Sequence, residues 1–260
     1  QSILKSSLFS ARIEGNPLTL QEITGKPSND QKKREVYNVL KGLQFVNQRG
    51  HRDITQTSLF ELHKRIMTGL TDREYLGKHR TEASAIFNTA GIAIYMPPPP
   101  KQIPSLMQKL IKYSNSDRES FVPIRACIAH YTFEKIHPFL DGNGRVGRLL
   151  LQAIMEKSGY GCKGLLTVEE YLDQNRTDYY HGFENTERDI TDYLEFMLEA
   201  LAETATQAKE LVTKQQTAAP EDFLLPRRAE MLRIIKEQKL VNFDMLHRRF
   251  LQINPRTLRY

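Results

Sequence analysis

Cysteine is scarce in this sequence, and long apolar stretches are missing altogether. The two cysteines, Cys127 in a helical apolar pattern and Cys162 in a glycine-flanked loop, favour free thiols in a reducing compartment over a disulfide framework. No run of about eighteen apolar residues occurs, so we expect neither a transmembrane helix nor a membrane partner. No segment resembles a secretory signal peptide, and a cytoplasmic location is therefore expected. Because the chain begins at Gln1 and not at a methionine, the sequence does not identify the native N-terminus.

The composition is that of an ordinary globular protein, but the charge is unevenly distributed. With 40% hydrophobic and 26% charged residues, the 260-residue chain has room for one large domain and a small one, or for two of moderate size. Residues 222–260 contain nine Lys or Arg and four Asp or Glu, a net charge of +5, whereas the remaining 221 residues carry only +1. This basic segment indicates an acidic partner, with DNA as the first candidate, or simply a solvated basic face.

The most informative stretch is residues 137–150, which precede and begin an amphipathic helix. That helix has apolar residues at helical spacing, namely Val146, Leu149, Leu150, Ala153 and Ile154. Just before it, Gly142 and Gly144 let the backbone turn its amides toward the helix start. Because unpaired N–H groups and the helix dipole favour an anion there, the stretch predicts a phosphate cradle.

Charged side chains surround this predicted cradle. Arg145 and Arg148 are three residues apart, so both guanidinium groups can converge on phosphate oxygens. Asp141 offers a hard oxygen ligand suited to Mg²⁺ bridging those phosphates. The pKa of a histidine lies near working pH, so His137 can take a proton from an incoming hydroxyl. Taken singly, such a histidine or a DGNG sequence is more often a packing residue or a turn, so the prediction depends on their combination.

The pattern His137-Pro-Phe-x-Asp-Gly-Asn-Gly-Arg-x-x-Arg148 resembles the signature of the Fic family at every specified position. Members of that family transfer AMP or related groups from nucleotides to protein hydroxyls. The resemblance implies a mainly α-helical Fic (Fido) bundle with a small β-hairpin flap, using ATP and Mg²⁺. It also implies that His137 is the general base and that Asp141 holds the metal. The amides of residues 142–144, with the Asn143 side chain, would orient the α-phosphate, and the two arginines would neutralise the β- and γ-phosphates.

A short N-terminal helix is expected from Leu4, Leu8 and Ala11, ending at the breaker sequence of residues 15–17. By propensity alone it is a helix end with an exposed glutamate. Its sequence Ser10-Ala-Arg-Ile-Glu14-Gly is similar to the built-in inhibitory helix of the family. The resemblance implies that Glu14 pairs with Arg148 and holds the enzyme inactive, and that Ser10 helps to seat the helix by hydrogen bonding.

Residues 77–100 change to the alternating pattern of a β-hairpin, with a turn near residues 88–91 and four prolines after the second strand as an extended connector. By resemblance this hairpin is the flap, on whose edge a segment of the target protein lies as an added strand. Ile86 then falls where the family has an apolar residue touching nucleotide or target. Tyr179 and Tyr180 match a pair that walls the base pocket in the family, with core filling as the alternative.

The remaining helical patterns cover residues 19–50, 55–69, 103–113 and 122–136, with Ile124, Cys127, Ile128 and Tyr131 on one face of the last. A further helix runs through Tyr193. We expect N-terminal helices at 1–56, a Fic core at 57–206, a linker at 207–221 and a winged-helix-like, helix-turn-helix module at 222–260. That module ends within its third helix and is therefore truncated. Arg256 and Arg259 open this helix and are the predicted DNA contacts.

The favoured function is AMP transfer from ATP to a Ser, Thr or Tyr hydroxyl of a target protein. Transfer of another nucleotide and the reverse reaction, removal of AMP, are close alternatives. A DNA-binding regulator with a nucleotide-sensing Fic core is an alternative of a different class. The target protein and the oligomeric state, including a homodimer, are left open by the sequence.

Overall fold

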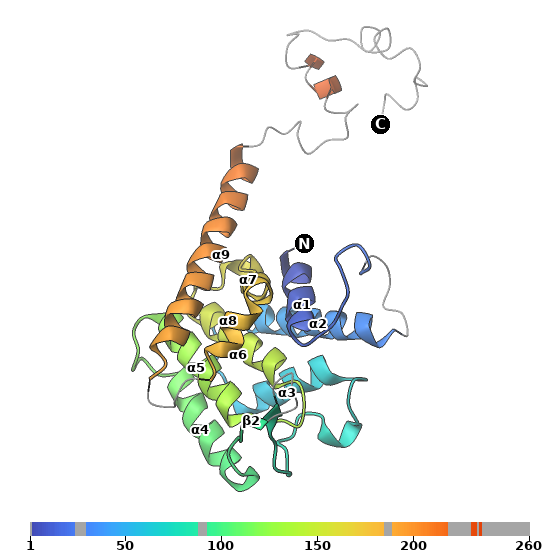
Figure 1. Ribbon diagram of the computed structural model, residues 1–260. Helices are drawn as coiled ribbons and strands as arrows, with labels where there is room; N and C mark the ends of the chain where they lie inside the picture. The colour runs from blue at the N-terminus through green and yellow to red at the C-terminus, as the bar shows by residue number, and fades with distance from the viewer. Residues whose placement is uncertain are drawn as a thin grey trace. The chain divides into compact units, whose positions relative to one another are not determined.

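The computed structural model describes residues 2–23, 30–87, 93–184, 189–217, 230–232 and 234–235. The chain divides into two compact units, Gln1–Ala208 and Lys209–Tyr260, which are described separately (Figure 1). In the second unit the described residues are the end of a long helix and the helical residues 230–232 and 234–235. Arg256, Arg259 and all of the predicted winged-helix module except these five helical residues lie outside the described residues, so the module and its DNA contacts remain predictions.

The first unit is mainly helical, as the sequence predicted. Its α-helices are α1 Ser2–Ile13, α2 Gln31–Arg49, α3 Gln56–Met67, α4 Ile103–Ser114, α5 Val122–Ile136, α6 Asn143–Lys157, α7 Val168–Gln174, α8 Arg176–His181 and α9 Thr191–Thr217, which continues past residue 208. Short 3-10 helices are η1 Arg73–Tyr75, η2 Pro100–Gln102 and η3 Cys162–Gly164. None of the helices described is long and apolar enough to cross a membrane.

The core is built around α6, which packs against α5 along its length (Figure 1). Four of the five predicted apolar positions of α6 have at most 1% of their surface exposed, namely Val146, Leu149, Leu150 and Ile154. Helix α2 approaches closely because it carries Gly42 at the crossing. A Cβ there would lie 2.8 Å from a methyl carbon of Leu149 and 2.9 Å from one of Ile66. The predicted apolar stripe therefore places the start of α6 firmly within the bundle.

The two short strands, β1 Ile86–Phe87 and β2 Ala93–Tyr95, pair antiparallel. Ile86 is opposite Tyr95 and Phe87 is opposite Ala93, with an irregularity in register between them. The predicted turn lies outside the described residues. The last of the four prolines does not continue the extended connector that the sequence predicted, since Pro100 is the first residue of η2, where its missing N–H costs nothing.

One prediction about a helix was wrong in extent. Helix α2 begins at Gln31, not near residue 19, because the Asp30 side chain caps it by accepting a hydrogen bond from the Lys32 amide at 2.9 Å. In α5, Ile124, Cys127, Ile128 and Tyr131 were predicted to lie on one face; Cys127 and Tyr131 are buried, whereas Ile124 and Ile128 keep partial exposure. The residues buried in α5 include Ala126, Ala129, His130 and Phe133, because α6 and α9 pack on that side.

Candidate functional site

The loop between α5 and α6 has a conformation that its own residues enforce. His137 caps the C-terminal end of α5 and has a left-handed backbone, with a φ of 49° and a ψ of 60°. Gly142, at the start of α6, is also left-handed, with a φ of 80°. Between them, the Asn143 carboxamide accepts from the Phe139 amide and donates to the Phe139 carbonyl, both at 2.9 Å. Asn143 was predicted to orient a phosphate, but its side chain is 2% exposed and is used by the loop backbone. Its role here is therefore to shape the loop.

At the start of α6, where the sequence predicted an anion cradle, a carboxylate faces the helix end. The first helical bond joins the Val146 amide to the Gly142 carbonyl at 3.0 Å, so the preceding amides point out of the helix end. A side chain on Gly144 would collide with the Glu14 carboxylate. Glu14 comes from the end of α1. Its negative charge therefore lies where the helix dipole and the exposed amides favour an anion.

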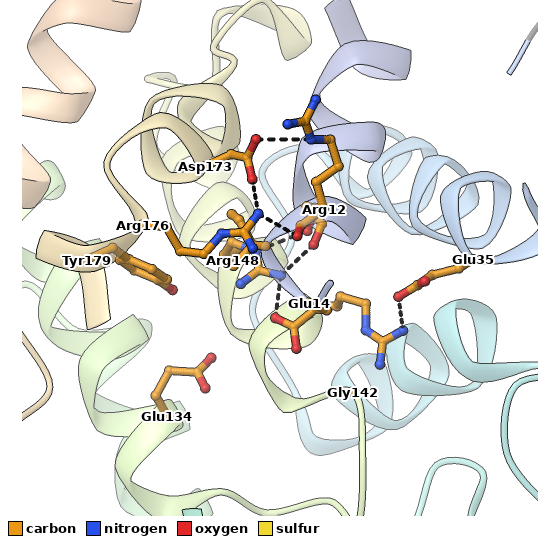
Figure 2. Close-up of polar contacts among 12 residues, drawn as sticks. Arg12, Glu14, Glu35, Glu134, Gly142, Arg148, Asp173, Arg176 and Tyr179 are labelled. Atoms are coloured by element: carbon orange, nitrogen blue, oxygen red, sulfur yellow. Dashed lines mark hydrogen bonds and ion pairs between the residues drawn. The ribbon is translucent and has the colours of Figure 1, made fainter. Parts of the chain in front are cut away.

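Glu14 and Arg148 form an ion pair inside the bundle, as Figure 2 shows. Arg148 Nη2 lies 2.9 Å from Glu14 Oε1, and the arginine is 3% exposed. Burial acts to raise the pKa of Glu14, but the charges of Arg148 and Arg145 outweigh it and leave that pKa below its usual value. Arg148 also donates to the hydroxyl of Ser10 at 3.0 Å and to its carbonyl at 2.9 Å. Ser10 therefore holds Arg148, which in turn holds Glu14.

The C-terminal end of α1 is anchored to α7 and α8 (Figure 2). Arg12 Nε lies 3.1 Å from Asp173, whose side chain is only 4% exposed and which also pairs with Arg176. Arg176 donates to the Arg12 carbonyl at 2.6 Å, and Tyr180 donates its hydroxyl to the Ile13 carbonyl at 3.1 Å. Because these donors satisfy carbonyls at the helix end, they fix the end of α1 that carries Glu14. No sequence pattern had singled out Asp173 or Arg176.

Replacing Asp173 by asparagine should loosen this anchor without touching Glu14 or Arg148. Two guanidinium groups would lose a nearly buried carboxylate, so α1 should detach more often. We expect faster amide hydrogen exchange in α1 than in the wild-type chain, while α5 and α6 exchange as before. Asp178→Asn is the matched control, because Asp178 is an exposed acid on α8 that forms no ion pair with any described residue. Unchanged exchange in Asp173→Asn would show that the anchor does not hold α1.

Arg145, the other predicted anion ligand, is also occupied by carboxylates. Its guanidinium lies 2.5 Å from Glu35 on α2 and 3.1 Å from Asp141. Burial raises the pKa of Glu35, although Arg145 acts in the opposite direction. The Asn16 amide donates to the second oxygen of Glu35 at 2.8 Å. Glu35 was missed by sequence reasoning, because a glutamate in the first turns of a helix carries no signal of its partner.

His137 lies at the mouth of the cradle with its Nδ1 buried, and within the described part of the chain this nitrogen has no hydrogen-bond partner. Burial lowers the pKa of the ring, while the Glu134 carbonyl acts to raise it. The ring is therefore neutral near pH 7, the form that can accept a proton. Its own carbonyl accepts from Arg80 Nε at 2.8 Å, and the same guanidinium donates to the carbonyls of Glu82 and Pro98. Arg80 thus ties both ends of the hairpin segment to the His137 turn.

Glu134 is a second acidic group behind the site, one turn before His137 on α5. Burial raises its pKa to about 8, with Arg148 acting against this shift and Glu14 acting with it. The carboxyl group is therefore protonated at neutral pH. A side chain on Gly147 would collide with it, so the glycine of the Arg-x-Gly-Arg segment leaves the space that this acid fills. The spacing of the motif alone did not reveal this partner.

The three remaining residues predicted to contact the nucleotide or target differ in how exposed they are. Tyr179 is 2% exposed and its hydroxyl lies 3.2 Å from His130 Nε2, so in this arrangement its ring belongs to the core. Tyr180 is 45% exposed and presents its ring beside the end of α1. Ile86 is half-buried in β1. Only Tyr180 and Ile86 of these three have surface that a ligand can reach.

Comparisons with known proteins agree on one family. Residues 53–155 match the model of the Fic/DOC family. A Drosophila melanogaster protein named "Protein adenylyltransferase Fic" is 30% identical over an alignment 208 residues long, which covers 75% of this chain and 40% of that protein. The chain therefore spans less than half the length of the curated relatives it matches.

Solved structures extend the likeness to the fold. A Fic family protein from Desulfovibrio desulfuricans G20 is 28% identical, with a TM-score of 0.72 over 85% of this chain and 67% of that one. Fic-1 from C. elegans is 23% identical and shares the fold, with a TM-score of 0.64 over 83% of this chain and 64% of that one.

Proposed function

We propose, from the premise that this chain carries a Fic domain, that the protein transfers AMP from ATP to a Ser, Thr or Tyr hydroxyl of a target protein. One observation carries the proposal: a carboxylate, Glu14, lies at the α6 N-terminus and pairs with Arg148. A glutamate in that position lies where a phosphate would bind, so it both indicates an anion site and blocks that site. The name of the Drosophila relatives, protein adenylyltransferase, supports ATP as the nucleotide.

The residues present fit a triphosphate and its metal ion. The amides of residues 142–144 and the side chains of Arg145 and Arg148 supply donors for phosphate oxygens. Asp141 uses Oδ1 for the Gly142 amide and Arg145, but its side chain is 60% exposed and can hold Mg²⁺. Among the described residues, no three His, Cys, Asp or Glu side chains are grouped so that they could hold a metal ion. An ion held by one carboxylate and the phosphates does not need such a group. Bound Mg²⁺ would neutralise charge on the phosphates.

In the proposed reaction His137 takes the proton of the target hydroxyl. The hydroxyl oxygen forms a bond to the α-phosphorus of ATP, and the bond from that phosphorus to the bridging oxygen breaks, so pyrophosphate leaves. The left-handed turn at His137 and the Arg80 bond to its carbonyl hold the ring at the mouth of the cradle. Because these contacts fix the backbone of His137 before the reaction, little reorganisation of this residue is needed in the transition state.

Self-inhibition follows from the same proposal. Arg148 cannot serve a terminal phosphate fully while it is paired with Glu14, and the glutamate charge repels that phosphate at close range. ATP that does bind would have its α-phosphate out of line with the incoming hydroxyl. Any movement of α1 removes the block without a covalent change.

Incubation of the Glu14→Gly variant with each labelled nucleoside triphosphate and magnesium, scored by self-modification and by transfer to lysate proteins, tests the transfer itself. We expect label from α-³²P-ATP but none from γ-³²P-ATP. Incorporation from the γ-label would mean phosphate transfer. Preference for another nucleotide, or net release of AMP from modified proteins, would favour one of the neighbouring reactions of the family.

The hairpin is the proposed docking site of the target segment. Strand β1 with Ile86 and strand β2 are held to the His137 turn through Arg80 and through Tyr95, which donates its hydroxyl to the Lys135 carbonyl at 2.9 Å. A segment that adds to this small sheet would therefore be held in register with His137.

DNA binding by the C-terminal module is a second candidate function, favoured by the net charge of +5 in residues 222–260. If Arg256 and Arg259 contact DNA, the protein should bind duplex with an affinity that falls steeply as salt rises. Gel-shift titration at several salt concentrations measures this, with Arg256→Ala/Arg259→Ala as the comparison. A module that shows no binding at low salt is instead a protein-docking element.

A further inference from the structure

A groove of about 590 Å³ lies between α4 and α5, on residues that the proposed chemistry does not use. Its volume falls within the range of about 300–1,000 Å³ that is common for binding sites. Apolar side chains from both helices and polar ones from the connecting loop line it: Leu106, Lys109, Leu110, Lys112, Tyr113, Ser116, Arg118, Ile128, Thr132 and Ile136.

The apolar part of the groove comes from one face of α5, which shares Ile128 with the face that the sequence analysis singled out. Ile128, Thr132 and Ile136 follow one another at one helical turn, and α6 packs on the other side of α5. Ile128 and Thr132 keep partial exposure. The Tyr113 hydroxyl on the opposite wall is buried and, within the described residues, has no hydrogen-bond partner. This stripe can therefore accept further apolar surface together with a polar group.

The rim of the groove carries three cations, one of which, Arg118, is flanked by two acids. Lys109, Lys112 and Arg118 are exposed, and no salt bridge among the described residues involves them. Residues 83–116, which include the hairpin and all of α4, contain three lysines and no Asp or Glu. The two acids beside Arg118 are engaged elsewhere: Asp117 pairs with Arg125 at 3.4 Å, and Glu119 accepts from the Phe121 amide at 2.8 Å.

One end of the groove adjoins the proposed reaction centre. Ile136 directly precedes His137, and the hairpin meets the same end of α5 through the bond from Tyr95 to Lys135. Helices α4 and α5 run side by side from there to the loop with Ser116 and Arg118 (Figure 1). A segment that occupied the groove would thus be continuous with one held by the hairpin.

We propose that this groove docks an acidic amphipathic helix of the target protein. The inference rests on the proposed transfer to a protein, which it deepens by naming the kind of target. Apolar anchors of such a helix, spaced three and four residues apart, match the Ile128, Thr132 and Ile136 stripe. Its acidic face would meet the three cations of the rim, which favour association and set orientation. A helix of about three turns spans about 16 Å, close to the length of α4.

A binding experiment without nucleotide tests the groove apart from catalysis. The probe is a labelled synthetic helix of about 18 residues with leucines on one face and glutamates on the other, measured by fluorescence anisotropy on the full chain. Its counterpart carries lysines in place of the glutamates. We expect the acidic probe to bind, with affinity that falls as salt rises, and the basic probe not to bind.

Two variants distinguish the groove from general charge attraction. Reversal of the rim, by Lys109→Glu, Lys112→Glu and Arg118→Glu, should weaken binding at least about tenfold. The matched reversal of exposed residues elsewhere, by Lys41→Glu, Arg52→Glu and Arg73→Glu, should change it little. Thr132→Arg adds positive charge but fills the groove, so docking predicts weaker binding and mere charge attraction predicts stronger binding.

Circular dichroism and thermal unfolding check that each variant is folded. Equal binding by the rim variant and the wild type, or stronger binding by Thr132→Arg, would overturn the proposal. Binding by a Glu14→Gly chain that transfers no nucleotide would count against the proposed function and leave the docking site standing. Transfer by a chain that does not bind the acidic probe would count against the docking site and leave the proposed function standing.

Discussion

A Glu14→Gly variant should modify itself or its target far faster than the wild-type chain, by about 10²-fold or more. Glu14 takes one contact of Arg148 at 2.9 Å and places a negative charge on the α6 N-terminus, next to Gly144. Its removal frees the guanidinium and the amides together. Because misplacing reacting atoms by about 1 Å can cost this much, restoring in-line geometry should gain as much. Label from α-³²P-ATP, with saturating magnesium ATP and the same target, measures the rate.

Two further variants show that the gain comes from the ion pair. Adding Arg148→Ala to Glu14→Gly should abolish the activity again, since the freed arginine is the group that the phosphates need. Glu14→Gln keeps the size of the side chain and removes its charge, so it should be activated as well, but less than the glycine variant. At neutral pH the low pKa of Glu14 keeps it ionised and the block in place. Equal rates for wild type and Glu14→Gly would show that this residue does not inhibit the enzyme.

His137→Ala, made in the Glu14→Gly background, should lose transfer by roughly 10²- to 10⁴-fold, the usual contribution of a general base. The ring lies outside the cradle, so nucleotide binding should persist. His181→Ala is the matched control, because the side chain of His181 is 73% exposed and remote in sequence from the motif. Calorimetry for ATP binding and the labelled transfer assay separate the two effects. A folded His137→Ala protein with undiminished transfer would assign the proton to another group.

The pH profile gives an independent check on His137. Burial lowers the pKa of the ring, so the neutral form that accepts a proton persists down to more acidic pH than for a free imidazole. Transfer should therefore be level near pH 7 and fall only below the ordinary value of about 6.5. A fall that begins above this value would point to a different titrating group.

Most of the helices, and the position of the motif within them, are determined by the sequence alone. The apolar stripe of α6 and the breaker glycines around it are local patterns, and local patterns set local structure. The same stretch indicates an anion site, because the chemistry of a helix start follows from its own residues. The pairing of Glu14 with Arg148 was available only through family resemblance, since 134 residues separate the two.

The hydrogen bonds and ion pairs between segments distant in the sequence are determined only by the tertiary structure. Glu35 reaches Arg145 across 110 residues, and Arg176 reaches the Arg12 carbonyl across 164. No periodicity or spacing marks such partners, because an acid or base on a helix has the same local sequence whether it faces solvent or another helix. The facing of α5 could not be read from the sequence for a related reason: both of its sides carry apolar residues, and only the position of α6 determines which side is buried and which side forms the groove.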